Sequence, residues 1–592
     1  MGIKTSTRKW AGYVALGLIA SPMALNAAPA DEPLIGNGPQ DYIVQAATLK
    51  AARRDVVKLG AAVRQELGII HAVSARLTGR QVAQLRRDHS AQVYADRSVA
   101  SASATGASGI SAADAALEAY DSSMALVDGT GVAEPTYLYQ TDYPMLVGAQ
   151  TLQQQGITGR GVTIAVLDTG LYQDPAQNFG NRILASVDVL NGMKPVTSDA
   201  YGHGTHITSI AAGGAINIAG SYFGIAPQAN LVIVRAFDGT GAGSYANVIA
   251  GLNWIVANQN KYRIRVLNLS FGAPPQSNYW NDPLNQAVMA AWKAGIVVVA
   301  SAGNAGPSPM TIGVPANVPY VVTAGALTDN NTPYNPTDDR LASFSSTGPT
   351  YEGFVKPEVV APGGHMVGSM PASSFLANID PHEMTANEHL FTMSGTSQAA
   401  AVTTGVVALM LQANGNLAPD DVKCRLIASA RPAVTAAGTL AYSVFQQGAG
   451  LVNAVAAVNS SALGCANQGL NVSADLAGTA HFGGPANEDA NGNYYIMNLT
   501  GSTWGTALPG DGLTWSSAYS SAQGYTWSQA YTWSQGYTWS QGYTWSQGYT
   551  WSQGYTWSQG YTWSQSVAWW GTTGSASATT SPASIDWWVP NE

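Results

Sequence analysis

The sequence is poor in charged residues, in cysteine and in long apolar runs. Only 10% of its 592 residues are charged, with a net charge of -9 at pH 7. Because no excess of basic residues is available to neutralise phosphates, the composition argues against a nucleic-acid partner. After the N-terminal segment no stretch reaches the about 20 apolar residues that a membrane-spanning helix needs. Hydrophobic residues still make up 46% of the chain, which is enough to bury a core of ordinary size.

Cysteine is nearly absent, and the two that occur, Cys424 and Cys465, allow one disulfide. In an oxidising compartment the two thiols could pair and join the end of the main domain to the segment that follows it. Sequence does not give their distance, so two free buried thiols are equally compatible with it.

The first 30 residues have the pattern of an export signal. Lys4, Arg8 and Lys9 precede an apolar stretch over residues 11–24, and small residues follow at 27–30. A single membrane anchor is the alternative, but the apolar stretch is short for one. The pattern predicts a secreted, extracellular protein.

Residues 31–135 are expected to form a small α+β domain and a linker. Helical spacing links Val56, Leu59, Val63 and Leu67, and a second short helix is expected around residues 82–85. Short strands are expected at residues 42–44, 72–77 and 92–96. The Ser/Ala/Gly-rich segment 98–109 is typical of a linker that buries too little apolar surface to fold.

Residues 140–460 alternate short apolar strands with helical patterns. Near-continuous β-branched runs are typical of a parallel sheet covered on both faces, so we expect an α/β, doubly wound, mostly parallel fold. The expected strands are residues 162–168, 230–237, 264–271, 295–303 and 320–327.

Residues 461–592 form a C-terminal extension of different composition. It is rich in Gly, Ser, Thr and Asn, and the hexamer YTWSQG recurs over residues 525–565. In an extended conformation Tyr, Trp and Gln would share one face. The repeat is typical of a low-complexity tail, and its aromatic side chains also suit contact with a cell surface or a polysaccharide. The corresponding alternative function is an adhesion protein that carries an enzyme-like domain.

Three motifs together point to acyl transfer by a serine nucleophile. Asp168 ends an expected strand, where open α/β sheets place their sites. His203 lies between glycines at an expected helix start, with His206 one turn further as packed support. Ser397 lies in the first turn of a long apolar helix, where unsatisfied N–H groups favour developing negative charge. A solvated Asp, a structural His and a helix-capping Ser would explain each motif alone but not the set.

The chain order Asp, His, Ser is that of subtilisin. The chain resembles the subtilisin-like serine peptidases over roughly residues 143–459, in the motifs DTG, GHGTH, LNLSFG, ASAGN, FSSTGP, KPEVVAPG and GTS. The resemblance implies a serine endopeptidase whose inhibitory propeptide precedes the peptidase domain. It also implies a maturation cut between the 98–109 segment and Tyr143.

The same resemblance implies roles for further residues. Asn304 would supply the oxyanion amide beside the backbone N–H of Ser397. Gly313 would form the floor of the pocket for P1, the residue before the scissile bond, and would leave room for a large apolar side chain. The two edges that hold an extended peptide by strand addition would be Gly243, Ser244 and Tyr245 on one side and Ser270, Phe271 and Gly272 on the other.

Two departures from the family pattern stand out. Gln398, Ala399, Ala400 and Ala401 follow the nucleophile where the family usually has Met-Ala-x-Pro, which keeps open a ligase or transpeptidase activity. An insertion at residues 364–391 holds several His and acidic residues, without the compact spacing of a metal site, and is expected to be a polar surface loop.

No cofactor is expected for the chemistry. Relatives often bind structural calcium, but the acidic cluster of Asp329, Asp338 and Asp339 is equally typical of a solvated turn, so no calcium site is assigned from sequence.

Overall fold

The computed structural model describes residues 38–88, 91–101, 142–216, 220–329, 339–384, 389–434 and 440–484, with short stretches beyond. The expected export signal lies outside these residues, as does most of the hexamer repeat. Within the repeat only the short antiparallel strands β22 (Tyr543–Thr544), β23 (Gln547–Thr550) and β24 (Gln553–Gly554) are described.

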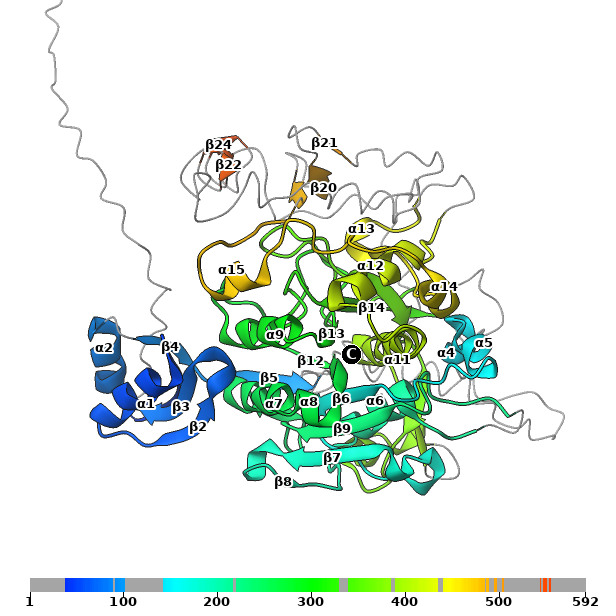
Figure 1. Cartoon of the computed structure of the whole chain (residues 1–592), viewed down its shortest axis with the longest axis horizontal. Helices are drawn as coiled ribbons and strands as arrows, with labels where there is room; N and C mark the ends of the chain where they lie inside the picture. The colour runs from blue at the N-terminus through cyan, green and yellow to red at the C-terminus, as the bar shows by residue number, and fades with distance from the viewer. Residues whose placement is uncertain are drawn as a thin grey trace, which may run out of the picture.

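A nine-stranded, mostly parallel sheet forms the centre of the molecule (Figure 1). Its order is β15-β14-β13-β11-β6-β9-β7-β8, with β16 also paired to β14. Only the edge strands β8 (Lys194–Pro195) and β15 (Arg340–Leu341) are antiparallel to their neighbours. The parallel strands are β6 (Thr163–Asp168), β7 (Ile183–Asp188), β9 (Asn230–Arg235), β11 (Ile264–Leu269), β13 (Val297–Ser301), β14 (Val322–Thr328) and β16 (Val359–Pro362). The α/β prediction is confirmed.

Helices cover both faces of this sheet. The helix α6 (His203–Ala212) packs with α11 (Thr396–Ala413) on one face, and α7 (Tyr245–Ala257) packs with α9 (Pro283–Lys293) on the other. All residues of α6 are buried, because it lies between the sheet, α11 and a hairpin described below. Shorter helices complete the layers: α4 (Tyr143–Leu146), α5 (Ala149–Gln154), α8 (Gln259–Tyr262), α12 (Pro419–Ser429), α13 (Val444–Gln447) and α14 (Ala454–Asn459).

The N-terminal region is a separate four-stranded antiparallel sheet, drawn in blue in Figure 1, with two helices. Its strands, in the order β2-β3-β1-β4, are β2 (Val63–Leu67), β3 (Ala72–Leu77), β1 (Gln40–Ala46) and β4 (Ala91–Ala95), and its helices are α1 (Leu49–Lys58) and α2 (Gly79–Asp88). The predicted helix through Val63 and Leu67 is wrong. The helix ends at Lys58 because Gly60 adopts a φ of 73°, and the chain then turns into β2.

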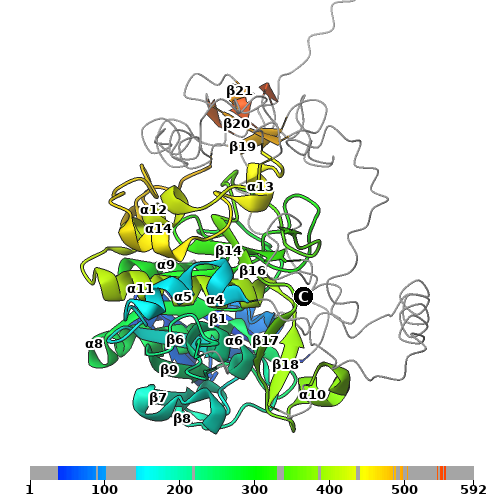
Figure 2. The ribbon, with the colours of Figure 1, turned by 90° about the vertical axis from the view of Figure 1, so that its right-hand side faces the viewer.

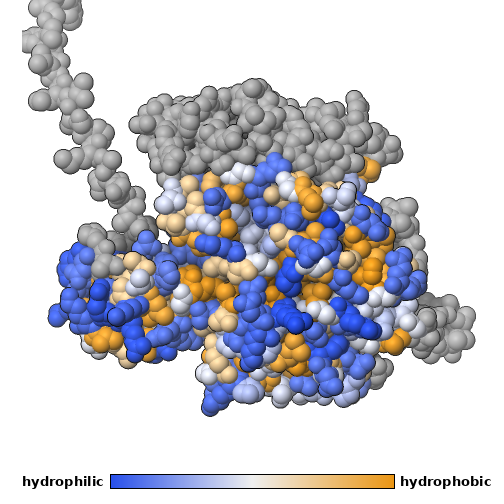
Figure 3. Space-filling view, viewed as in Figure 1, coloured by the Kyte–Doolittle hydropathy of each residue, from blue (hydrophilic) through white to orange (hydrophobic). Residues whose placement is uncertain are grey.

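This region packs against the face formed by α7 and α9. Gln65 donates to Asn247 of α7 at 3.1 Å, and the N–H of Ile69 donates to Asn253 of the same helix at 2.8 Å. On the face shown in Figure 3, apolar side chains gather where the two parts meet. The N-terminal region is therefore docked through both apolar and polar contacts.

The start of the expected linker is a strand. Residues Ser98–Ser101 form β5, which lies between β10 (Ala242–Ser244) and β12 (Phe271–Gly272) and pairs antiparallel with both. Because neighbouring edges satisfy its backbone groups, this Ser/Ala segment is ordered without a core of its own. The rest of the linker lies outside the described residues.

The insertion is a hairpin with a helix at its tip, and the expectation of a polar surface loop is wrong. Its strands β17 (Met366–Ser369) and β18 (Leu390–Met393) are antiparallel, and α10 (Phe375–Ile379) lies between them in the chain. Figure 2 shows the hairpin beside α6. Apolar residues of the hairpin and its helix form a buried cluster with Tyr201: Met370, Leu376, Ala377, Phe391 and Met393.

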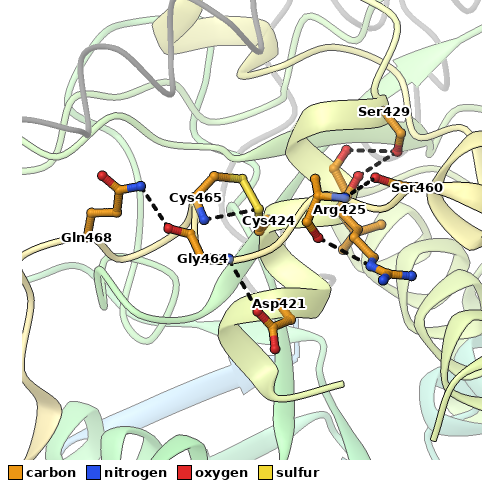
Figure 4. Close-up of a disulfide and its surroundings, with 10 residues drawn as sticks. Asp421, Cys424, Arg425, Ser429, Ser460, Gly464, Cys465 and Gln468 are labelled. Atoms are coloured by element: carbon orange, nitrogen blue, oxygen red, sulfur yellow. Dashed lines mark hydrogen bonds between the residues drawn. A yellow bond between two sulfur atoms is a disulfide. The ribbon is translucent and has the colours of Figure 1, made fainter. Parts of the chain in front are cut away.

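The first part of the C-terminal extension packs onto the domain of the nine-stranded sheet. Cys424 of α12 and Cys465 form a disulfide with a Cα–Cα distance of 5.1 Å (Figure 4). After α15 (Val472–Leu476), Phe482 is buried in the main core, and Gly484 passes so close to Gly353 that a Cβ would meet its carbonyl oxygen at 2.1 Å. The short strands β19 (Ala486–Glu488), β20 (Tyr494–Met497) and β21 (Thr503–Trp504) follow. Across the described part of the chain, no helix has both the length and the apolarity to cross a bilayer.

Candidate active site

Asp168 and His203 form a buried pair. Asp168 is the last residue of β6, and its Oδ1 lies 2.8 Å from Nδ1 of His203, the first residue of α6. The N–H of Thr169 donates to the same oxygen at 2.7 Å. A carboxylate that accepts from Nδ1–H selects the tautomer with a lone pair on Nε2, which a histidine base needs.

The close approach of α6 to the end of β6 depends on glycine. A Cβ on Gly204 would come within 2.4 Å of the carbonyl oxygen of Gly170 and 3.2 Å of Cβ of Asp168. Gly170 itself has a φ of 124°, and a Cβ there would lie 2.4 Å from the carbonyl oxygen of Ser198. The glycines of DTG and GHG therefore allow the hydrogen bond between the two side chains.

Asp199 was missed by the sequence analysis, and it holds the turn before His203. Its Oδ1 accepts from the N–H groups of Tyr201 and Gly202 at 3.2 and 2.8 Å. Its Oδ2 accepts from the N–H and the hydroxyl of Thr205, both at 2.8 Å. An acidic residue just before a helix start is a capping signal, and it could have been found in the sequence SDAYGHG.

Ser397 is the second residue of α11, and the first turns of α6 and α11 lie against each other. Nε2 of Gln398 is 3.4 Å from Nδ1 of His206, which joins the turn after Ser397 to the turn after His203. Oγ of Ser397 is 3.4 Å from the carbonyl oxygen of Ser270, whose hydroxyl donates to the carbonyl of Ser397 at 3.1 Å. Ser397 is thus at a buried helix N-terminus beside the end of β11.

Asn304 is oriented by Thr396, the residue before Ser397. Its Oδ1 accepts from the N–H and the hydroxyl of Thr396 at 3.0 and 2.8 Å. Because both contacts are donors, they identify this atom as the oxygen. Its Nδ2 is buried and has no hydrogen-bond partner among the described residues. A donor held in this way suits stabilisation of an oxyanion formed next to Ser397.

His206 is neutral and acts as packing support. Its Nε2 lies 3.1 and 3.0 Å from the carbonyl oxygens of Met366 and Phe391, one on each strand of the hairpin, so this atom carries the proton. Nδ1 is then the acceptor and Gln398 the donor. Burial lowers the pKa of His206 to about 3. The imidazole therefore joins the hairpin to the helix of Ser397.

The two predicted peptide-binding edges face each other across β5. Strand β5 lies between them as a third strand, and the N–H of Ser101 donates to the carbonyl of Gly241 at 3.0 Å. Tyr245 does not pair within β10, because it begins α7, but its N–H donates to the carbonyl of Arg97 at 2.9 Å. The paired residues are Ser98 with Ser244, Val99 with Gly243, Ala100 with both Ala242 and Gly272, and Ser101 with Phe271.

Gly313 lies next to the second edge. Val314 and Ala273 form an antiparallel bridge, and a Cβ on Gly313 would come to 3.2 Å from the carbonyl oxygen of Ala273. The structure thus places Gly313 beside the residue that follows β12, and its role as the pocket floor stays a prediction.

Comparisons with known proteins identify the family of the chain. The family model described as Subtilase family matches residues 159–450. The chain is 31% identical to subtilisin DY from Bacillus licheniformis over 314 residues, which cover 53% of this chain and 96% of that protein. The chain belongs to the subtilase family. As the relatives are serine proteases, this subtilase is a serine endopeptidase.

Two further similarities are partial. The subtilase is 40% identical to serine protease AprX from Bacillus subtilis over 274 residues, but this match covers only 61% of AprX and 45% of this chain. The solved structure of fervidolysin from Fervidobacterium pennivorans, a keratinolytic enzyme related to subtilisin, aligns with a TM-score of 0.53 and 20% identity. It covers 78% of this chain and 64% of fervidolysin. At this identity the likeness supports the fold alone.

In the residues that the structure describes, no group of three or more His, Cys, Asp or Glu side chains gathers in a way that could hold a metal ion. Asp338 and Glu388, which belong to the two acidic segments singled out from the sequence, lie outside the described residues.

Proposed function

We propose that this subtilase is a secreted endopeptidase that hydrolyses peptide bonds through an acyl-enzyme on Ser397. The buried Asp168–His203 pair carries the proposal. His203 begins a helix that packs against the helix of Ser397, and Gln398, next to Ser397, contacts His206 of that helix. Secretion rests on the export pattern of residues 1–30. The chemistry uses protein groups alone.

The steps follow from the positions of these groups. His203 takes the proton of the Ser397 hydroxyl through Nε2 while Oγ attacks the peptide carbonyl carbon, and Asp168 stabilises the imidazolium. The carbonyl electron pair moves to oxygen, which accepts hydrogen bonds from Nδ2 of Asn304 and the N–H of Ser397. As the C–N bond breaks, the imidazolium protonates the leaving amine. Water then attacks the ester by the same route and frees Ser397.

The N-terminal region is proposed to act as an intramolecular inhibitor. Strand β5 fills the groove between β10 and β12, where an extended substrate would add as a strand. From Ala100 to Ser101 its partners run from Gly272 to Phe271, toward Ser270 and hence toward Ser397. The strand therefore enters the site in the direction of a substrate, and we expect the maturation cut within a few residues after Ser101.

The P1 pocket is proposed to accept large apolar side chains. Gly313 at its expected floor has no side chain to fill it. The neighbouring residues Ala273 and Ala302 are small, and the N–H of Gly313 donates to the carbonyl of Ala302 at 3.2 Å.

The test is Ser397→Ala, with Ser429→Ala as the matched control. Ser429 lies on α12, where its hydroxyl bonds only its own helix. We expect Ser397→Ala to lose casein hydrolysis and to keep its N-terminal region attached, as seen by intact-mass spectrometry. The Ser429 variant should cleave casein and start shortly after Ser101. Undiminished activity of Ser397→Ala would refute the assignment.

A further inference from the structure

The position of Ser101 relative to the scissile bond follows from the register of β5. Ser101 is paired with Phe271, the first residue of β12, and the residue before it is Ser270, whose carbonyl oxygen lies 3.4 Å from Oγ of Ser397. The residue opposite Ser270 is therefore the one whose carbonyl reacts, P1. Ser101 precedes it and occupies the P2 position.

The side chain of Ser101 and the ring of Tyr201 both lie next to the same face of Gly241. A Cβ on Gly241 would lie 2.7 Å from Oγ of Ser101 and 2.6 Å from Cζ of Tyr201. Ser101 has no exposed surface, and Tyr201 is also buried. The space next to the P2 side chain is thus already occupied by an aromatic ring.

The insertion fixes the position of this ring. Phe375 of α10 stacks on Tyr201 with the ring centroids 5.7 Å apart and an interplanar angle of 21°. The N–H of Phe375 donates to the carbonyl of Ala200 at 2.8 Å, and the N–H of Leu376 donates to the carbonyl of Tyr201 at 3.2 Å. Backbone and ring of Tyr201 are therefore both held by α10.

The backbone around Tyr201 leaves the ring no space to retreat. A Cβ on Gly202 would meet Sδ of Met370 at 2.2 Å, so the insertion packs directly on the backbone between Tyr201 and His203. His206 of α6 hydrogen-bonds both strands of the same hairpin, through the carbonyl oxygens of Met366 and Phe391. Because packed cores resist displacement, a larger P2 side chain would have to move the whole assembly.

We propose that the insertion of residues 364–391, acting through Tyr201, restricts P2 to small side chains such as Ser, Ala and Gly. This rests on the proposed function, and it names a class of substrate for the same site. Tyr201 is the specificity-determining residue, and Phe375 is a positioning residue that acts through it.

The experiment compares kcat/KM of the mature enzyme for peptides that differ only at P2, as Ser, Ala, Leu or Phe. For the wild type we expect Phe to be poorer than Ser by about 10-fold or more, since its ring needs the space of Tyr201. Tyr201→Ala should reduce this difference to about 3-fold or less, and Phe375→Ala should give an intermediate value. Ile379→Ala is the matched control, because Ile379 is exposed at the far end of the same helix.

The chain also contains its own P2 test. Ser101→Phe should slow propeptide removal by about 10-fold, and adding Tyr201→Ala should restore it, whereas adding Ile379→Ala should not. This rescue cannot arise from a merely structural role of Tyr201. It also provides a readout if Tyr201→Ala alone matures poorly.

The outcomes separate the two proposals. A wild-type enzyme that cleaves all four peptides equally well overturns the inference and leaves the endopeptidase intact. A P2 preference that survives unchanged in both Tyr201→Ala and Phe375→Ala also overturns it. If no peptide is cleaved, the proposed function itself fails, and the restriction at P2 fails with it.

Discussion

Two Asp–His pairs in this molecule have the same geometry but different surroundings. Asp168 and His203 are 2.8 Å apart in the active site, and Asp475 and His481 are also 2.8 Å apart in the C-terminal segment. Asp475 additionally accepts from the hydroxyls of Tyr279 and Tyr320 at 2.8 and 2.6 Å.

The residues beyond each imidazole differ as well. His481 stacks on Trp280 with the centroids 4.8 Å apart, whereas the helix of His203 packs against the helix of a buried serine. Burial and the nearby charge of Asp475 raise the pKa of Tyr279 and of Tyr320, so both hydroxyls stay protonated donors. The two pairs therefore differ through their neighbours: those of the first suit a catalytic role, whereas the second attaches a chain segment to the core.

The largest expected effect is on Asp168. The substitution Asp168→Asn should lower kcat by about 10⁴-fold, because an amide no longer holds His203 in the tautomer of a base. Stability should change less than for Asp475, because Asp168 accepts from one side chain and one N–H, whereas Asp475 accepts from three side chains. The checks are peptide hydrolysis at 25 °C and chemical unfolding in the Ser397→Ala background, where self-digestion is absent. A kcat within tenfold of wild type would contradict the assignment of Asp168.

The second largest effect is expected on stability rather than on catalysis. Asp475→Asn is expected to leave kcat/KM within about twofold of the wild-type value. The side chains that donate to Asp475 in the described part of the chain are Tyr279, Tyr320 and His481, which lie outside the proposed substrate groove. The substitution should lower the free energy of unfolding by about 2–4 kcal/mol, since two buried tyrosine hydroxyls and the half-buried His481 lose a charged acceptor. Unfolding is again measured in the Ser397→Ala background, and Asp168→Asn serves as the reciprocal control. Full stability would show that the second pair does not attach the segment.

The smallest expected effect concerns Glu352, which lies close to the second pair. Its Oε1 accepts from the N–H of Tyr279 at 2.9 Å, and its Oε2 has no hydrogen-bond partner among the described residues. Burial raises the pKa of Glu352 to about 7, with a further contribution from the charge of Asp475. For an acid with a raised pKa in the folded state, stability is highest below the unfolded pKa and is lost as pH rises toward 7.

The raised pKa corresponds to a loss of at most about 3 kcal/mol from the free energy of unfolding above pH 7. In Glu352→Gln the side chain stays neutral at every pH. The free energy of unfolding of this variant should therefore exceed that of the parent by about 1–2 kcal/mol at pH 8 and by nearly nothing at pH 4. The measurement is denaturant unfolding at both pH values, again in the Ser397→Ala background. An equal difference at pH 4 and pH 8 would show that Glu352 does not titrate in this range.

Most of the fold and the set of candidate site residues could be predicted from the sequence. The β-branched runs that end at Asp168 and Leu269 became central parallel strands, because burial on both faces leaves a clear pattern. Asp168 and His203 are brought together as expected, and Asn304 faces the start of α11 with its amide nitrogen available. Their catalytic roles stay a prediction until the variants are measured.

The features that the sequence did not predict depend on contacts between distant residues, which leave no pattern in the local sequence. Ser98–Ser101 has the composition of a linker and is a strand only because β10 and β12 supply partners. The insertion looks polar by composition, yet Met370 and Phe391 are buried against Tyr201. Similarly, the second Asp–His pair joins residues of the C-terminal segment, and its two tyrosine partners come from distant parts of the chain.

The disulfide between Cys424 and Cys465 has a consequence for an enzyme surrounded by active copies of itself. A backbone break anywhere from residue 425 to 464 would open a ring and release no fragment, because the bridge still spans the gap. Such damage would stay hidden in an electrophoresis lane run without thiol, and would show as two bands once the bridge is reduced.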